Sequence, residues 1–260
     1  MSHEVRTPLT AILGFTELLL EPSDDVDVLR RHAQTIRRNS QHLLGVLNDA
    51  LDMSKMDAGM MRIHRQPFDP RALVREIIEL YLPRAREKGI ELRCEIGTMP
   101  DNVDTDEQRV RQVLINLLSN AVKFTERGEV VVRAGYDSSS AMLHLEVQDT
   151  GIGILPEHIE SIFRPYQQAV NDDVRRFGGT GLGLAISQRL AGLLGGRLTV
   201  NSRPGEGATF VLSIPAPEVG VQELAERQKL QVPEPWRPRP SWHVLIVEDT
   251  LEHQKILYAV

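Results

Sequence analysis

The chain contains no long apolar run, a single cysteine and few aromatic residues. None of its apolar stretches approaches the roughly 20 residues that a helix needs to cross a bilayer. One cysteine, Cys94, excludes an intramolecular disulfide. A net charge of −6 and a pI near 5.8 exclude the basic surface that is typical of nucleic-acid-binding proteins. These absences leave an ordinary globular protein, with 41% hydrophobic and 25% charged residues.

Apolar residues at steps of three and four predict two helices near the start of the chain, separated by a loop at residues 21–25. A single helical hairpin buries little surface, so we expect two copies to pair into a four-helix bundle. The repeats are Val5, Leu9, Ile12, Thr16 and Leu19, followed by Leu29, Ala33, Ile36, Ser40, Leu43, Leu47 and Ala50.

A histidine beside a carboxylate begins the first predicted helix. His3 precedes Glu4, and Thr7 follows His3 by one helical turn, on a face away from the apolar seam. Imidazole is mostly neutral near pH 7 and is therefore nucleophilic, while Glu4 can draw a proton from its second ring nitrogen. A His-Glu pair alone proves nothing, but together with a glycine-rich nucleotide site far downstream it indicates a histidine that accepts a phosphoryl group. The competing interpretation is a plain exposed histidine.

From about Phe68 the chain alternates helical and strand-like segments, which predicts an α/β sandwich with helices on one face of a mixed sheet. Cys94 falls in the first strand, and we expect a buried core thiol there. Helices are expected at 71–88, 106–124, 156–163 and 184–194, and strands at 90–96, 130–136, 143–148, 198–201 and 208–214.

One of these helices carries a polar face that suits a nucleotide. Asn116, Asn120 and Lys123 recur at steps of four and three, so they share one side of the helix. The amide oxygen of Asn120 is a ligand that Mg²⁺ accepts, and Lys123 can meet phosphate charge. The alternative is an ordinary amphipathic helix with a solvated face.

Two glycine-rich segments follow strands or precede a helix. In Asp149–Gly153, a carboxylate can accept a hydrogen bond from the exocyclic amine of adenine, and the glycines let the backbone run close to a flat ring. A turn is the alternative, because Asp and Gly are common in turns. Residues 177–184 lead into a helix whose free amides can point toward phosphates. Together, these segments predict one nucleotide pocket.

In this order the segments resemble the sensor histidine kinases, in which a dimerisation and phosphoacceptor hairpin precedes an ATPase domain of the GHKL, or Bergerat, type. The resemblance extends from Ser2 to about Pro215. The motifs that carry it are Ser2–Thr10, Asn116–Phe124, Asp149–Gly153, Ile162–Gln167, Gly179–Gly183 and Gly205–Phe210.

The resemblance implies an enzyme that phosphorylates His3 with ATP and Mg²⁺ and passes the phosphoryl group to an aspartate of a receiver domain. Glu4 is then the base, and Thr7 orients a water that dephosphorylates the partner. Asn116 is expected to bond to Glu4 during transfer, and Asn120 to hold Mg²⁺.

The same resemblance implies the nucleotide site. Asp149 would read adenine and Thr209 would support its carboxylate, while Lys123 and Arg175 would contact phosphates. The full expected set is Asn120, Lys123, Phe124, Asp149, Gly151, Gly153, Arg175, Gly179, Thr180, Gly181, Leu182, Gly183 and Thr209.

The last part of the chain changes composition. Six prolines between 215 and 240 predict a semi-rigid linker. The run Trp242–Asp249 resembles the first strand of a receiver domain, a doubly wound α/β fold, which ends in an acidic pair. We therefore expect domains at 1–64 (hairpin), 65–217 (ATP binding), 218–241 (linker) and 242–260 (truncated receiver), in a fragment of a hybrid kinase.

The expected partners follow from this division. They are a second copy through the hairpin and a receiver domain, either the chain's own or a separate one, with no nucleic acid. A cytoplasmic location is expected, with membrane contact only through a segment upstream of Met1. A nucleotide-regulated dimerisation module with little kinase activity is the alternative function, and a fragment of a GHKL chaperone or topoisomerase is a more distant one.

Overall fold

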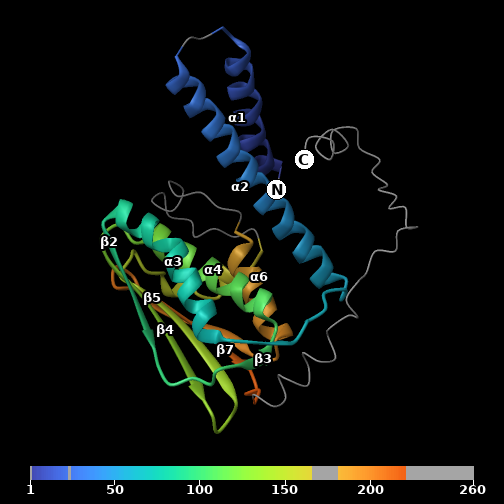
Figure 1. The fold of residues 1–260 in the computed structure, drawn as a ribbon, viewed down its shortest axis with the longest axis vertical. Helices are drawn as coiled ribbons and strands as arrows, with labels where there is room; N and C mark the ends of the chain where they lie inside the picture. The colour runs from blue at the N-terminus through green and yellow to red at the C-terminus, as the bar shows by residue number, and fades with distance from the viewer. Residues whose placement is uncertain (1, 23–24, 166–180, 221–260) are drawn as a thin grey trace, which may run out of the picture. The chain divides into compact units, whose positions relative to one another are not determined.

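The structure is a computed structural model that describes residues 2–22, 25–165 and 181–220 (Figure 1). The predicted receiver segment and the linker from residue 221 onward lie outside the described residues. Among the residues described, no helix is both long enough and apolar enough to span a membrane. The elements are α1 (Ser2–Leu20), α2 (Val26–Asp57), β1 (Gln66–Phe68), α3 (Pro70–Lys88), β2 (Ile90–Ile96), β3 (Val103–Thr105), α4 (Glu107–Phe124), β4 (Gly128–Asp137), β5 (Met142–Asp149), α6 (Gly183–Leu193), β6 (Arg197–Arg203) and β7 (Gly207–Pro215).

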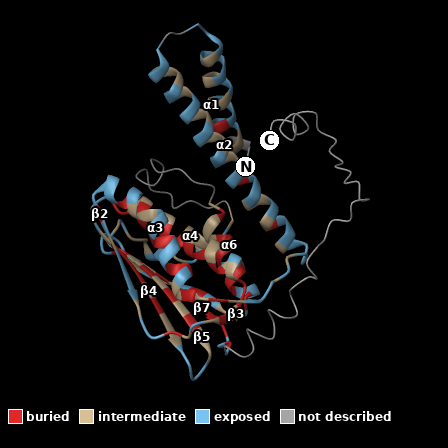
Figure 2. Cartoon of the chain, in the orientation of Figure 1, coloured by how far each residue is buried: buried red, intermediate tan, exposed pale blue. Residues whose placement is uncertain are grey.

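The first two helices form the expected antiparallel hairpin, and α2 is much the longer. Asp25 caps α2, because its carboxylate accepts hydrogen bonds from the amides of Asp27 and Val28 at 2.9 and 3.1 Å. Only Val46 and Met53 among the apolar residues of α2 are buried. Most of the hairpin surface is exposed (Figure 2), so this pair of helices has little core of its own.

A five-stranded sheet in the order β2-β4-β5-β7-β6 forms the second part. β2 and β4 are parallel, whereas the other neighbours are antiparallel, so the predicted mixed sheet is confirmed. Helices α3, α4 and α6 pack on one face, where the buried apolar residues gather (Figures 1 and 2). On the other face, Arg133 bonds to Glu95 and Glu146 at 2.7 and 2.6 Å.

Local signals explain where these helices begin and end. Asp69 caps α3, Pro70 occupies its first turn, and Gly89 ends it with a left-handed φ of 71°. Asp106 caps α4 through the amide of Arg109, and its second oxygen accepts a hydrogen bond from the amide of His64 at 2.8 Å. One buried carboxylate therefore fixes both the helix start and the segment that leads from α2.

Four details differ from the sequence expectations. β1 and β3 form a small antiparallel sheet that was not predicted, and Glu218 and Val219 attach to it rather than belonging to a free linker. The helix expected at 156–163 is two short 3₁₀ turns, Pro156–His158 and Ser161–Phe163, neither of which has a side-chain cap. Cys94 is exposed rather than buried, because β2 is at the edge of the sheet that the described residues form.

Candidate functional site

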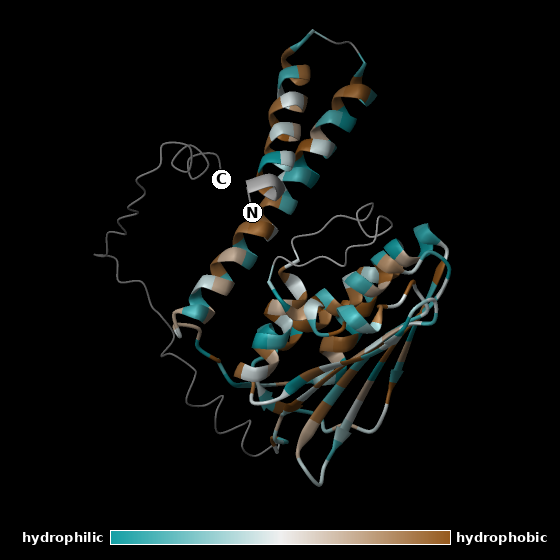
Figure 3. Cartoon of the chain, turned by 180° about the vertical axis from the view of Figure 1, so that it is seen from behind, coloured by the Kyte–Doolittle hydropathy of each residue, from teal (hydrophilic) through white to brown (hydrophobic). Residues whose placement is uncertain are grey.

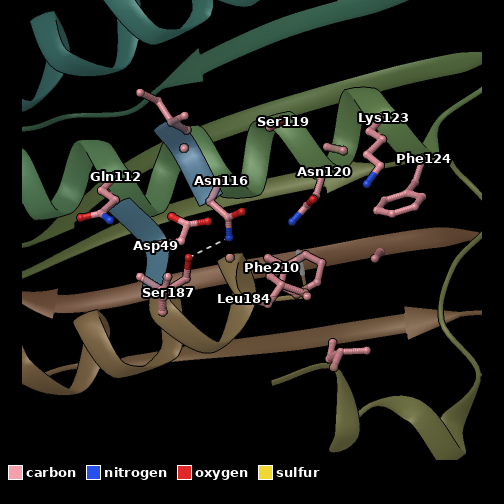
Figure 4. A pocket seen from close by; sticks show the side chains of 18 of the residues that line it. Asp49, Gln112, Asn116, Ser119, Asn120, Lys123, Phe124, Leu184, Ser187 and Phe210 are labelled. Carbon is pink, nitrogen blue, oxygen red and sulfur yellow. Dashed lines mark hydrogen bonds between the residues drawn. The ribbon is translucent and has the colours of Figure 1, made fainter. Parts of the chain in front are cut away.

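A cavity of about 1480 Å³ brings together the helix, strand and glycine motifs that the sequence singled out. α4 forms one wall, the loop after β5 and the start of α6 form others, and residues of α2 and α3 also line it. In Figure 4, Asn120, Lys123 and Phe124 project from α4 toward the cavity, and Phe210 and Leu184 lie opposite. A cavity with one apolar wall and several convergent polar groups is typical of a small-molecule site.

Asp149 ends β5 inside this cavity and is only 7% exposed. Its carboxylate accepts hydrogen bonds from the backbone amides of Gly151, at 2.8 Å, and Ala208. Burial raises the pKa of Asp149, and these two hydrogen bonds oppose that rise. Among the described residues, the hydrogen bonds to this carboxylate come from neutral backbone amides. A buried acceptor of this kind is suited to a neutral donor such as an exocyclic amine.

The glycines around Asp149 are required by packing of the protein on itself. A Cβ at Gly207, where φ is +94°, would overlap the carbonyl oxygen of Asp149. One at Gly153, where φ is +67°, would overlap the carbonyl oxygen of Arg203, and one at Gly151 would lie 2.5 Å from that of Phe124. These glycines therefore fix the position of the carboxylate, a reason different from the close approach to a ring that the sequence suggested.

The predicted support from Thr209 is wrong. In the sheet register Asp149 pairs with Ala208, whereas Thr209 pairs with Gln148 and Asn201. Because successive side chains of a strand point to opposite faces, Thr209 faces away from the cavity. The carboxylate of Asp149 is held by backbone amides instead.

Asn116, Asn120 and Lys123 all line the cavity, as their spacing predicted. The side-chain amide of Asn116 donates a 2.8 Å hydrogen bond to the hydroxyl of Ser187 in α6 (Figure 4). A Cβ at Gly183, the first residue of α6, would overlap the amide oxygen of Asn116. Asn116 therefore joins α4 to α6, a contact that its place in the sequence did not indicate.

Lys123 lies at the end of α4 beside an aromatic ring. Its ammonium nitrogen is 4.7 Å from the ring centroid of Phe124. Burial lowers the pKa of Lys123, and the nearby charge of Arg84 lowers it further. Lys88 completes this end of the helix, because its ammonium donates to the carbonyl oxygens of Val122, Lys123 and Thr125 at 2.7–2.8 Å.

Two residues of α3, Tyr81 and Arg84, line the cavity and were missed. Neither belongs to a motif, and Arg84 is separated from Lys123 by two strands and most of a helix. No spacing rule connects them, so only the packing of α3 beside α4 reveals the pair.

Some of the remaining predicted site residues belong to the part of the chain that the structure describes, and others do not. Gly181 (φ +63°), Leu182 and Gly183 form the start of α6, with Gly181 and Gly183 lining the cavity and Leu182 buried. Thr7 is exposed on α1. His3 and Glu4 belong to the first turn of α1, but their side chains lie outside the described part, as do Arg175, Gly179 and Thr180.

The possible metal ligands in the cavity suit a hard cation such as Mg²⁺ that is bound to the phosphates of a nucleotide. Asn120 offers one amide oxygen to the cavity, and no group of three His, Cys, Asp or Glu side chains that could cage a metal occurs among the described residues. Mg²⁺ commonly keeps several waters and binds through one or two protein oxygens together with substrate phosphates. Asn120 therefore fits Mg²⁺ bound as a nucleotide complex and not as an independent metal centre.

The second hairpin helix contacts the α/β part through polar side chains. Asp52 of α2 accepts a 2.9 Å hydrogen bond from Gln112 and lies 3.4 Å from the guanidinium of Arg109, both in α4. Asp57, near the end of α2, forms an ion pair with Arg189 of α6. The cavity is consequently lined on one side by α2, which belongs to the hairpin that carries His3.

Comparison with known proteins gives two family matches. Residues 1–59 match the His Kinase A phospho-acceptor domain, and residues 105–218 match the histidine kinase-, DNA gyrase B- and HSP90-like ATPase domain. Among curated relatives, the aerobic respiration control sensor protein ArcB of Escherichia coli K12 is 39% identical over 251 residues, 96% of this chain. The autoinducer 2 sensor kinase/phosphatase LuxQ of Vibrio parahaemolyticus is 38% identical over 267 residues, covering all of this chain. The chain spans only 31% of the length of each.

Solved structures agree with this assignment. The crystal structure of full-length ShkA in complex with AMPPNP matches with a TM-score of 0.66 and 35% identity, over 85% of this chain and 45% of that one. Histidine kinase ThkA in complex with the response regulator TrrA matches with a TM-score of 0.60 and 25% identity, over 82% of this chain and 59% of that one. The hairpin and mixed sheet thus have the same arrangement as in proteins of known structure.

Proposed function

Since the chain belongs to the sensor histidine kinase family, we propose that it binds ATP with Mg²⁺ and transfers the γ-phosphoryl group to His3. The observation that carries the proposal is the shared cavity, in which Asp149, Asn120 and Lys123 meet at a site that α2 also lines. A nucleotide bound in this cavity would lie beside α2, which belongs to the hairpin that carries His3.

Transfer requires little covalent chemistry from the protein beyond positioning and proton removal. A ring nitrogen of His3 attacks the γ-phosphorus, the bond from that phosphorus to the bridging oxygen breaks, and ADP leaves. Glu4 accepts the proton that the imidazole loses from its other nitrogen. Bound Mg²⁺ neutralises phosphate charge, and Asn120 is the residue that we assign to hold it.

The nucleotide contacts are assigned residue by residue. Asp149 accepts the hydrogen bond from adenine, and Lys123 and Arg175 contact phosphates. Gly181 and Gly183 lie at the start of α6, whose N-terminal amides favour an anion, and we assign Gly179 and Thr180 to the same phosphate-binding set. Thr7 orients water if the protein also dephosphorylates its partner.

We propose that the hairpin forms a homodimer, and its exposed apolar surface supports this. Large apolar side chains are exposed along both helices, and Figure 3 shows hydrophobic segments on both. Covering them in a four-helix bundle would remove them from water. The exposed residues are Leu9, Leu13, Leu18, Leu20, Val26, Leu44, Leu47 and Leu51. An aspartate of a receiver domain is the proposed acceptor, in the cytoplasm, where ATP is available.

The test is incubation with γ-³²P-labelled ATP and Mg²⁺, followed by mapping of the modified residue. We expect acid-labile, alkali-stable label on His3, lost in His3→Gln and retained in His144→Gln. His144 is a suitable control because it lies away from the cavity, hydrogen-bonded to Ser213. Label at the wild-type level in His3→Gln would show another acceptor. Tight ATP binding without any label would favour a nucleotide-regulated dimerisation module.

A further inference from the structure

Arg84 of α3 shares the cavity with Lys123, Asn120 and Phe124 but has no assigned role. Its helix packs beside α4, and both Arg84 and Lys123 line the cavity. The charge of Arg84 lowers the pKa of both Lys123 and Lys88, although burial is the larger cause for each.

Arg84 differs from the other arginines that line the cavity. Arg109 forms an ion pair with Asp52 at 3.4 Å, and Arg111 forms ion pairs with Glu76 and Glu107 at 2.8 and 2.7 Å. Within the described ranges, no carboxylate forms an ion pair with Arg84. Two like charges that converge on a cavity repel each other, and an anion bound between them would relieve that repulsion.

We propose that Arg84 and Lys123 together bind the phosphate tail of the nucleotide, so that α3 supplies a phosphate contact in addition to the motif residues. This inference rests on the proposed function as an ATP-binding kinase. A guanidinium can bind two phosphate oxygens at once, whereas the ammonium acts as a point charge. Arg84 therefore distinguishes phosphorylated nucleotides from the bare nucleoside.

Removing Arg84 should change phosphate binding in opposite directions according to whether Arg84 contacts phosphate or only repels Lys123. If Arg84 acted only by repelling Lys123, its removal would make Lys123 easier to protonate and would tighten phosphate binding or leave it unchanged. If Arg84 contacts phosphate, its removal weakens binding. Arg75, an exposed arginine of the same helix that does not line the cavity, is the matched control for loss of one positive charge.

The experiment titrates AMPPNP with Mg²⁺, ADP with Mg²⁺ and adenosine into the wild-type chain and into Arg84→Gln, Arg84→Lys and Arg75→Gln. We expect Arg84→Gln to weaken AMPPNP and ADP by about 5- to 30-fold, the scale of a charged hydrogen bond at a partly exposed site. Adenosine should bind all four proteins equally. The affinity of Arg84→Lys for AMPPNP and ADP should lie between those of the wild type and Arg84→Gln, because lysine keeps the positive charge but cannot bind two phosphate oxygens at once.

The outcomes separate the two hypotheses. If the wild type fails to bind AMPPNP, the proposed function is wrong. If the wild type binds and Arg84→Gln binds AMPPNP equally well or more tightly, the kinase proposal stands and the role of Arg84 is wrong. An equal loss in Arg75→Gln, or an equal loss for adenosine, also overturns it, because the effect would then be general charge or damage to the fold.

Discussion

Replacing Asp149 with Asn should weaken nucleotide binding while making the empty protein more stable at neutral pH. The side chain is 7% exposed and carries a buried charge that burial disfavours, which is why its pKa is raised. Asn removes that charge but keeps an oxygen for the backbone amides of Gly151 and Ala208. It also presents an NH₂ group, which cannot accept a hydrogen bond from adenine.

The two effects have calculable signs. An unmatched donor in a buried pocket costs about 1–3 kcal/mol, which corresponds to roughly 5- to 150-fold weaker binding. For stability, a carboxyl with a raised pKa holds its proton more tightly in the folded protein. The free energy of unfolding therefore falls as pH rises from the unfolded value near 3.8 through the folded pKa. Asp149→Asn removes this loss of stability. The variant should therefore have a higher free energy of unfolding than the wild type above the folded pKa of Asp149, and this difference should disappear below pH 3.8.

Calorimetric titration with AMPPNP and urea unfolding at pH 3.5 and pH 8 measure both effects. Glu146→Gln is the control, because Glu146 lies on the same strand, faces the opposite side of the sheet and bonds to Arg133. Nucleotide affinity should be unchanged in the control. Unchanged affinity in Asp149→Asn would show that Asp149 does not bind adenine. Lower stability than the wild type at pH 8 would show that burial does not disfavour the charged form of Asp149.

Three further predictions concern other parts of the chain. Gly205→Ala and Gly207→Ala both place a Cβ at positive φ, but only the Cβ at Gly207 would overlap a backbone carbonyl, that of Asp149. Urea unfolding should therefore show that the free energy of unfolding falls by about 1–2 kcal/mol in Gly205→Ala and by about 2–4 kcal/mol in Gly207→Ala. Equal losses in the two variants would exclude the overlap. Asp52→Asn weakens the link to Arg109, and amide exchange at the end of α2 should become faster; unchanged exchange would mean that the contact does not hold α2. Serine hydrogen bonds lower the pKa of Asp137 to about 2, so its stabilisation is present above pH 3.8 and lost as pH falls through 2. Asp137→Asn should therefore lower the melting temperature at pH 7 and leave it unchanged near pH 1.5, and the reverse pattern would refute the shift.

Local chemistry made much of the fold predictable. The boundaries of α3 follow from Asp69, Pro70 and Gly89, each of which acts on its own neighbours. The polar face of α4 could be found because a helix brings residues three and four apart together, whatever packs on it. Motif order then placed Asp149 and α4 in one cavity.

The errors occurred where the answer depends on partners that are distant in sequence. Thr209 and Ala208 are adjacent, and the pairing of β5 with β7 sets Ala208, and not Thr209, beside Asp149. Cys94 alternates like a core residue, yet its exposure depends on β2 being the edge of the sheet. Arg84 reaches the cavity through helix packing, which no local pattern encodes.

Asn116 shows how such a distant partner changes the interpretation of a motif. Its predicted task was to bond to Glu4 during transfer, and this stays a prediction. One N–H of its amide donates to Ser187, which is 1% exposed, and its oxygen lies against Gly183, while the second N–H of the amide can still serve Glu4. The contacts with α6 show that Asn116 is also a positioning residue. It fixes the first turn of α6 against α4, and with it the loop end at Gly181 that lines the cavity.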